Sequence, residues 1–301
     1  MGLNMTGPGG ELPTGSDSEP RGPTVLRMIL GSQLRRFRES AGVTPEQAAY
    51  EIRASRSKIS RMEHGRVGFK SRDVTDLLAL YGVGDEQVLA RMLAFAEQAS
   101  TPGWWSKYDD VLPDWFEAFL GLEGAASVIR TFELQFVYGL FQTEAYARAV
   151  TWLGNKTAPG EEIDRRVSVR LKRQAVLTSP EPPQVWSVMD EAVLRRPVGG
   201  RPVMRAQLAH LIEVASLPRI TLQVVPFARG GHAASGGSFT VLRFAEPEVP
   251  DIVYIEQLTS ALYLDGREDV DHYLEVMNEL STEALTPARS ADLLAEITKE
   301  T

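Results

Sequence analysis

The sequence contains no cysteine in its 301 residues. This absence excludes disulfide bonds and metal sites with thiolate ligands. Histidine is also scarce, and the four that occur lie far apart, without the spacing of a metal site. They are His64, His210, His232 and His272. We therefore expect neither a bound metal nor a cofactor.

Long apolar runs are missing as well. No uninterrupted apolar stretch approaches the roughly 18 residues that a membrane-spanning helix needs. The N-terminus lacks the charged-then-apolar pattern of a signal peptide, so we expect a cytoplasmic protein. With 43% hydrophobic and 24% charged residues, the composition is that of a globular protein, and the length favours about two domains.

Positive charge is in deficit overall, because the net charge is −8. The charge is unevenly distributed along the sequence. Residues 30–70 contain nine Lys or Arg against four Glu, a local charge of +5, so the rest of the chain carries −13. Phosphates respond to the field within a Debye length, roughly 8 Å at physiological salt. A basic module on an acidic body is therefore compatible with DNA binding. Charge alone is equally compatible with an ordinary solvated face.

Apolar residues are few at the start of the chain. Residues 1–24 contain six Gly and four Pro among Ser, Thr and charged residues. Such a stretch cannot bury enough apolar surface to offset its ordering entropy. We expect a disordered tail over 1–24, with order beginning near Val25.

Helical signals follow in quick succession. Thr44, Pro45 and Gln47 form the sequence signature of a capping box with proline at the first helical position. Ser55 is the expected N-cap of the next helix, and Gly42 follows the first helix where a C-terminal glycine is usual. Five helices are predicted, over residues 30–41, 45–52, 55–65, 73–81 and 85–98.

The second and third of these helices have the pattern of a helix-turn-helix. The paired Ala48 and Ala49 allow two short helices to cross closely, and Ile52 and Ile59 fill the space between them. In this motif the N-terminal part of the second helix enters the major groove. A plain helical bundle is the alternative interpretation. The predicted DNA-binding residues are Arg56, Ser57, Ser60 and Arg61 on the groove face, Lys58 toward phosphate, and Thr44 and Gln47 on the preceding helix.

The stretch from Gly42 to Gly65 resembles the phage-repressor (Xre-like) helix-turn-helix family. In that family an arginine of the first helix pairs with a glutamate that ends the recognition helix, which implies a structural ion pair between Arg38 and Glu63. The family usually opens the second helix with glutamine, whereas this chain has Pro45, which cannot donate an amide to phosphate.

Two arginines of the predicted recognition helix have two interpretations. Arg56 and Arg61 can each read guanine through two hydrogen bonds, worth about 1–3 kcal/mol of discrimination, or can grip phosphate instead. A single module of this kind rarely binds tightly, so we expect a homodimer on a two-fold-related, double-stranded DNA operator.

Beyond residue 100 the pattern changes to a mixture of helices and strands. The overall class predicted is α+β, with an all-α five-helix domain over 25–100 and an α+β domain with a small, mostly antiparallel sheet over 101–301. Strands are predicted over 185–189, 220–227, 239–244 and 252–256. Helices are predicted over 113–129, 142–153, 161–178, 203–215, 269–280 and 290–297.

Five segments of this second domain, 138–149, 166–174, 190–195, 223–226 and 284–290, carry a further resemblance. They are similar to an actinobacterial family of Xre-like regulators whose C-terminal domain was long of unknown function, the WhiJ-like family. That resemblance implies an antitoxin-like transcriptional regulator, often encoded beside a small partner protein. Where relatives commonly have proline before their Gly-Leu-Leu-Gln-Thr run, this chain has Tyr138 and Phe141, so local packing there is expected to differ.

Charged residues of the second domain are candidates for binding a ligand or partner. Arg166, Arg170 and Arg173 recur at helical spacing and form a basic stripe, or a solvated face balanced by nearby glutamates. Glu191 and Glu256 follow apolar strands, where carboxylates can point into a cleft, although ordinary strand-end carboxylates are more common.

The glycine-rich segment 230–237 joins two predicted strands. It lacks the lysine and following helix of a phosphate-binding P-loop, so a flexible hairpin connection is the favoured interpretation.

Function is predicted on these grounds as sequence-specific transcriptional regulation, with a C-terminal domain that senses a small partner protein, a peptide or a small ligand. No enzyme is expected. The alternative is a hydrolase-like enzyme fused to a DNA-binding domain and using Glu191, Glu256 or His232, but no nucleophile, base and orienting group occur at recognisable spacing.

Overall fold

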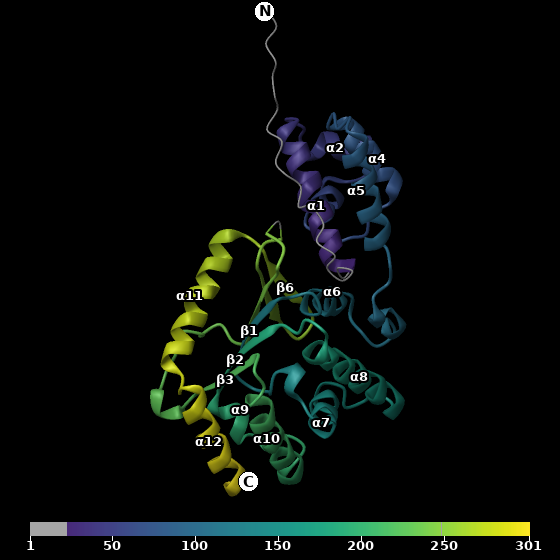
Figure 1. The fold of residues 1–301 in the computed structure, drawn as a ribbon. Helices are drawn as coiled ribbons and strands as arrows, with labels where there is room; N and C mark the ends of the chain where they lie inside the picture. The colour runs from purple at the N-terminus through teal and green to yellow at the C-terminus, as the bar shows by residue number, and fades with distance from the viewer. Residues whose placement is uncertain (1–22, 248) are drawn as a thin grey trace, which may run out of the picture.

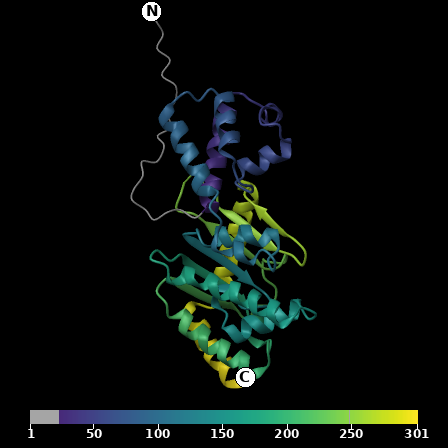
Figure 2. The ribbon, with the colours of Figure 1, turned by 90° about the vertical axis from the view of Figure 1, so that its right-hand side faces the viewer.

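A computed structural model describes residues 23–247 and 249–301. Residues 1–22 of the predicted tail lie outside the described residues. Residues 23 and 24 already belong to the first helix, α1 (Pro23–Ser40), which begins seven residues before the predicted start at Leu30. A helical domain stacks on one end of a larger α/β part (Figure 1), and Figure 2 shows the same stacking after a quarter turn.

The N-terminal domain has five helices between residues 23 and 99, as predicted. After α1 come α2 (Pro45–Glu51), α3 (Arg56–Glu63), α4 (Ser71–Leu80) and α5 (Glu86–Ala99). The predicted capping box is confirmed, because Thr44 Oγ1 accepts from the Gln47 N–H while Gln47 Oε1 accepts from the Thr44 N–H. Ser55 caps α3, as expected.

The first helix belongs to two cores at once. Its second half places Leu30 and Leu34 in the core of the helical domain. Its first half places Val25, Met28 and Ile29 in the main core of the α/β part, with residues of α6 (Asp114–Glu123) and of the sheet. Burying an apolar side chain stabilises a fold by roughly 1.5–3 kcal/mol, so α1 couples the two parts firmly.

Among the described residues, six strands form one mixed sheet in the order β3-β2-β1-β4-β5-β6. Strands β1, β2 and β3 are mutually parallel, and the pairs β1–β4, β4–β5 and β5–β6 are antiparallel. The strands are β1 (Val128–Glu133), β2 (Gln184–Asp190), β3 (Ile220–Val225), β4 (Phe239–Arg243), β5 (Ile252–Glu256) and β6 (Ala261–Leu264).

The α+β class is therefore confirmed, but the prediction of a small, mostly antiparallel sheet is wrong. The central strand β1 was missed because the helix predicted over 113–129 runs into it, whereas α6 ends at Glu123. Parallel neighbours require long crossovers, and the predicted helices supply them. The β1–β2 crossover contains η2 (Gly139–Phe141), α7 (Glu144–Gly154), α8 (Gly160–Arg173) and η3 (Gln174–Thr178), and the β2–β3 crossover contains α9 (Glu191–Arg195) and α10 (Arg201–Ala215).

The segment 230–237 is likewise not a hairpin connection. It follows β3 and a short turn, η4 (Phe227–Arg229), and leads to β4. Because β2 and β1 lie between β3 and β4 in the sheet, the connection passes over two strands. Sequence order alone cannot distinguish this crossing from a hairpin.

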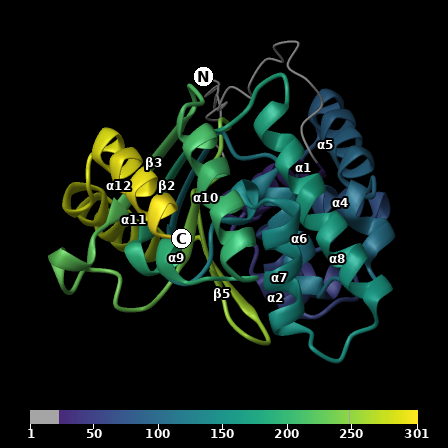
Figure 3. The same cartoon turned by 90° about the horizontal axis from the view of Figure 1, so that it is seen from below.

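Helices cover both faces of the sheet, as the view from below shows (Figure 3). Helix α11 (Arg267–Glu283) packs on one face, and α6, α7 and α10 pack on the other. The last helix, α12 (Pro287–Glu300), lies along α10 and β3. There the Val224 N–H donates to Ser290 Oγ (3.0 Å), which satisfies a backbone group of the edge strand. None of the helices in the described part of the chain is long and apolar enough to cross a membrane.

Candidate nucleic-acid interface

The turn between α2 and α3 sets the direction of α3. Arg53 has φ +52°, the one positive φ of a non-glycine residue in the described chain. The following N–H, that of Ala54, donates to Ala49 O at 2.8 Å, which closes the turn. A side chain in this left-handed conformation costs roughly 1–2 kcal/mol, so surrounding packing holds the turn in place.

One side of α3 is fixed in the core. Ile59 and Met62 are each only 1% exposed, and both belong to the cluster that contains Ala48 and Ala49 of α2. At the start of the helix, Ser55 Oγ accepts from the Lys58 N–H (3.2 Å), as an N-cap should. The buried side and the cap together leave the other side of α3 outward.

The outward side carries the residues predicted to face DNA. Arg56, Ser57, Ser60 and Arg61 are all exposed, at positions that share one helical face. The Arg56 side chain is 75% exposed and pairs with Glu46 of α2 at 3.1 Å. Arg61 forms no ion pair among the described residues, so its guanidinium is the most available of this face. We call these four residues the α3 outer face.

Other predicted contacts are already engaged within the protein. Lys58 Nζ lies 2.7 Å from Asp73 Oδ2, which directs this ammonium toward α4. Thr44 and Gln47 lie exposed at the start of α2 and use their side-chain oxygens in the capping box, which leaves the Gln47 amide NH₂ for an outside acceptor. Sequence reasoning had assigned Lys58 to phosphate without this neighbour.

Two exposed residues beside this surface were missed from the sequence. Tyr50, at 85% exposure, is an unusually open aromatic side chain on α2, one turn from Gln47. Arg53 projects from the turn itself and is also exposed. The sequence did carry a signal for Arg53: it is an arginine at the position where the tight turn of this motif favours glycine.

Glu63 at the end of α3 and Arg38 of α1 form the ion pair that the family resemblance implies. Arg38 Nε lies 2.6 Å from Glu63 Oε1, and Nη2 lies 3.0 Å from Oε2. The third arm, Nη1, donates to Val43 O at 3.0 Å. The hydrogen bond with Glu63 raises the pKa of Arg38, and both side chains are about nine-tenths buried. This fork fixes the end of α3 to α1.

Two glycines allow the same helices to approach closely. A Cβ on Gly31 of α1 would lie 2.3 Å from Met62 O, and one on Gly65 would lie 2.7 Å from Met28 Cα. Gly65 also has φ +65°, a conformation that ends the helix without strain. The end of α3 therefore rests on the backbone of α1.

The segment after α3 also touches the second domain. Arg66 Nη2 donates to Tyr263 O (3.2 Å) and to Asp265 Oδ2 (3.4 Å), just beyond β6. His64 Nε2 lies 3.9 Å from the same carboxylate. The end of the candidate recognition helix is thus joined to the α/β part both by this contact and through α1.

In the second domain, Arg173 is a structural residue. Its guanidinium forms a bidentate ion pair with Glu123: Nε donates to Oε2 (2.8 Å) and Nη2 donates to Oε1 (2.7 Å). Both side chains are buried. Tyr138 Oη donates to the same carboxylate at 2.6 Å. Tyr138 is one of the two residues that depart from the family pattern, and this hydrogen bond is what its side chain contributes here. Burial and the charge of Glu123 raise the pKa of Tyr138.

The remaining candidates divide between separate places. Arg166 pairs with Glu162 one turn away on the surface of α8 (2.8 Å). Glu191 accepts from Arg195 Nε (2.5 Å) and from the Phe227 N–H (2.8 Å), which ties α9 to the end of β3. The predicted basic stripe is therefore not one continuous surface.

Arg170 and Glu256, in contrast, lie in one charged region. Arg170 Nη1 donates to Gln142 Oε1 at 3.3 Å, and Glu256 Oε2 accepts from Tyr254 Oη at 3.1 Å. Burial and the neighbouring Arg173 lower the pKa of Arg170 to about 10, while Glu256 and Glu133 act in the opposite direction. Sequence reasoning missed Glu133, whose strand was not predicted.

The three residues of the hydrolase alternative are not brought together. His232 packs its ring edge-to-face with Phe132 (5.0 Å between centroids) and lies 3.8 Å from Asp190. Glu191 and Glu256 have the partners given above, and no hydrogen bond or ion pair joins any two of the three among residues 23–247 and 249–301. Within those same ranges, no group of three or more metal-ligating side chains forms a candidate metal site.

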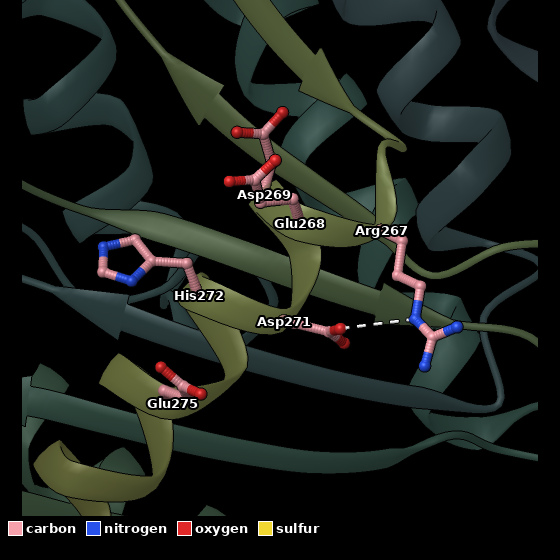
Figure 4. A pocket seen from close by; sticks show the side chains of 6 residues that line it. All are labelled: Arg267, Glu268, Asp269, Asp271, His272 and Glu275. Carbon is pink, nitrogen blue, oxygen red and sulfur yellow. Dashed lines mark ion pairs between the residues drawn. The ribbon is translucent and has the colours of Figure 1, made fainter.

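An open hollow lies on the surface of α11 (Figure 4). Its lining comes from the first turns of this single helix, including the ion pair of Arg267 with Asp271. A hollow with one wall cannot enclose a ligand, so we assign no site to it.

Comparison with known protein families agrees with this two-part structure. A model of a helix-turn-helix domain matches residues 29–91, so this segment of the chain is a helix-turn-helix domain. A second model, described as a domain of unknown function (DUF5753), matches residues 116–296, more than half of the chain. The chain belongs to this DUF5753 family. Searches of curated proteins and of solved structures gave no match.

Proposed function

We propose that this protein is a sequence-specific transcriptional regulator that binds double-stranded DNA through the α3 outer face. The observation that carries the proposal is the contrast between the two sides of α3. Ile59 and Met62 are locked in the core, whereas Arg56 and Arg61 stand exposed on a surface of local positive charge. A helix presented in this way fits the major groove, where arginine reads guanine or grips phosphate.

The finer assignments belong to the same proposal. The protein is cytoplasmic and its helix-turn-helix is of the Xre type. It binds as a homodimer, because one such module contacts too few base pairs for tight binding. We place it among the WhiJ-like regulators of actinobacteria on the sequence resemblance, with an antitoxin-like C-terminal domain and a small partner protein encoded nearby.

The C-terminal domain senses a partner protein, a peptide or a small ligand and biases DNA binding. What supports this is the double connection from that domain to α3, through the shared helix α1 and through Arg66 and Asp265. Coupling between two such sites is typically about 1–3 kcal/mol. The domain acts by binding and not by catalysis, in keeping with the separate positions of Glu191, Glu256 and His232.

The test begins with selection of bound sequences from a random pool of DNA duplexes by the full chain. The proposal expects one enriched motif with two-fold symmetry. Failure to enrich any motif, at a salt concentration where weak binding persists, would remove the claim of sequence specificity.

Arginine variants then separate readout from phosphate contact on the selected duplex. If Arg61 reads a base, Arg61→Ala should lose about 1–3 kcal/mol and relax preference at one position. If Arg56 grips phosphate, Arg56→Ala should weaken all duplexes equally and lower the salt dependence by about one ion. Unchanged binding in both variants would show that α3 is not the reading helix.

A further inference from the structure

Three cationic side chains gather around one aromatic ring at the start of the second domain. The ring is that of Tyr108, the last residue of the short helix η1 (Trp104–Tyr108). Lys107 Nζ lies 5.6 Å from its centroid. From α8, Lys172 Nζ and Arg165 Cζ each lie 5.2 Å from the same centroid. Residues from two elements therefore place their positive charges at one point of the surface.

Among the described residues, Arg165 alone of these three cations has a carboxylate partner. Its Nη2 donates to Asp110 Oδ1 and to Lys107 O (2.9 Å), so this guanidinium ties α8 to η1. Lys107 and Lys172 are exposed and form no ion pair within the described chain. Lys172 lowers the pKa of Lys107, as a neighbouring like charge does. Two adjacent ammonium groups thus lack a counter-charge.

The surroundings make this local excess of positive charge notable. Outside residues 30–70 the chain carries a net charge of −13, so carboxylates are in surplus there. Two other cations of α8 have taken carboxylate partners, since Arg166 pairs with Glu162 (2.8 Å) and Arg173 with Glu123 (2.7 Å). A positive patch on an acidic domain attracts and orients an acidic partner.

An exposed aromatic side chain lies beside the two lysines. Trp104 is 39% exposed, and its ring meets the rings of Trp105 and Tyr108 edge to face, at 5.8 and 6.3 Å between centroids. Trp105 and Tyr108 are themselves buried, in a small core that includes Val169 of α8. Trp104 is therefore held on a rigid base. Tryptophan in such a position is a frequent anchor in contacts between proteins.

We propose that Lys107, Lys172 and Trp104, together the Tyr108 patch, bind an acidic peptide segment of a partner protein. Carboxylates of the segment pair with the two ammonium groups, and an apolar side chain of the segment covers the indole ring. A simple inorganic anion would use the lysines and leave Trp104 exposed. Nucleic acid is less suited, because the α3 outer face lies in the helical domain, whereas α8 lies in the α/β part below it (Figure 1).

The Tyr108 patch is built on the elements that join the two domains. A Cβ on Gly121 of α6 would meet Thr24 Oγ1 of α1 and would lie 3.1 Å from Trp105 Cη2. Trp105 and the start of α1 therefore pack against the same turn of α6. An occupant of the patch contacts η1, which rests on the helix that both cores share.

The proposal names the partner class and the surface of the sensing domain, and in that respect rests on the proposed function. Peptide binding is measured without DNA, so the two can fail separately. Loss of peptide binding with an intact DNA motif removes this inference alone. Peptide binding without any enriched DNA motif removes the regulator.

The direct test is calorimetric titration of the full chain with synthetic peptides. The probes are hexaglutamate and an alternating Glu-Leu hexapeptide, with hexalysine and inorganic phosphate as comparisons. Both acidic peptides should bind, the Glu-Leu peptide more tightly, with an affinity that falls about tenfold from low to high salt. If neither acidic peptide binds at millimolar concentration, or if phosphate displaces them, the proposed ligand class is wrong.

Matched variants locate the site. Lys107→Gln combined with Lys172→Gln should weaken both acidic peptides at least about tenfold. Lys156→Gln should leave binding unchanged, although it also removes a lysine placed over an aromatic ring, that of Trp152 at 5.9 Å. All three lysines are exposed, so these variants should keep the melting temperature of the parent.

Trp104→Ala separates the aromatic contribution from the charge. It should weaken the Glu-Leu peptide more than hexaglutamate, because only the former has an apolar side chain to cover the indole. Full peptide binding by the double lysine variant would overturn the assignment. If that variant instead lost affinity for a random-sequence DNA duplex while binding the peptides normally, the patch would be a nucleic-acid surface.

Discussion

At the scale of single residues, the buried Arg38–Glu63 pair is the most consequential contact in the helix-turn-helix. We expect Glu63→Ala to destabilise the chain by about 3–5 kcal/mol, because the Arg38 charge would be left buried without its partner. The measurement is thermal or urea unfolding of the full chain. The full chain is needed because the start of α1 is buried in the second domain.

The control for that experiment is Glu39→Ala. Glu39 also pairs with an arginine of α1, Arg35 at 2.8 Å, but both of those side chains are about half exposed. An exposed pair of this kind contributes roughly 0–1 kcal/mol. Equal, small losses from Glu63→Ala and Glu39→Ala would show that the buried pair does not brace α3.

Glu133 gives the fold a specific pH dependence. Burial, with Glu256 nearby, raises its pKa from 4.5 to about 8, against smaller opposite effects of Thr131, Arg173 and Ser238. Between those values the unfolded chain has lost this proton while the folded chain keeps it. The contribution to stability therefore falls as pH rises from about 4.5 to 8, by at most ~1.4 kcal/mol per pH unit, and levels off above.

The neutral variant Glu133→Gln should remove this slope. We expect its unfolding free energy to match the parent near pH 5 and to exceed it at pH 8.5. Chemical unfolding at a series of pH values measures the difference. A gap that stays constant across the series would mean that Glu133 titrates normally.

At the scale of elements, the close contact between α1 and the end of α3 depends on Gly31. A Cβ there meets the backbone oxygen of Met62 at 2.3 Å, and backbone cannot move aside as a flexible side chain can. We expect Gly31→Ala to cost about 1–3 kcal/mol and to weaken DNA binding by displacing α3. Unfolding and DNA titration of the same variant measure both effects.

Gly68→Ala is the comparison, because a Cβ at Gly68 meets nothing within 4 Å. It should leave both stability and DNA binding close to those of the parent. If Gly31→Ala behaved like Gly68→Ala, the tight packing of α3 on α1 would contribute neither to stability nor to DNA binding.

Elements defined by local signals could be predicted from the sequence, and those defined by distant neighbours could not. Thr44, Ser55 and Asp85 cap their helices through contacts within three residues, and those helices were predicted correctly. Strand β1 is stabilised by β2 and β4, which lie far along the chain, and it was missed. The short strand β6 was missed for the same reason, since its partner is β5.

The candidate sites follow the same division. The α3 outer face could be predicted because helical spacing and the motif determine which residues point outward. Glu133 could not, because its charge acts on Arg170 only once β1 takes its place inside the sheet, and that strand was not predicted. Lys58 shows the converse, since its partner Asp73 lies on another helix, and sequence spacing gave no sign of their contact.

At the scale of the whole molecule, the contact of Arg66 with Asp265 joins the two domains beside α3. Asp265 neutralises a cation near the DNA-facing surface. We expect Asp265→Ala to change stability by less than about 1 kcal/mol, because the pair is partly exposed. We also expect it to tighten DNA binding roughly threefold and to add about one ion to the salt dependence.

The matched control is Asp271→Ala, which removes an acid of α11 paired with the far more exposed Arg267. It changes net charge equally but leaves the domain contact intact. Equal DNA affinities for the two variants would indicate a general charge effect and no role for the contact.

The central claim, that the α3 outer face binds DNA, is tested most directly by one titration series. The affinity of the full chain for its selected duplex is measured against salt concentration for the parent, Arg61→Ala and Arg267→Ala, whose side chain is 96% exposed in the other domain. The account predicts that Arg61→Ala loses about tenfold or more in affinity while Arg267→Ala matches the parent. Equal affinities and equal salt slopes for all three proteins would contradict it.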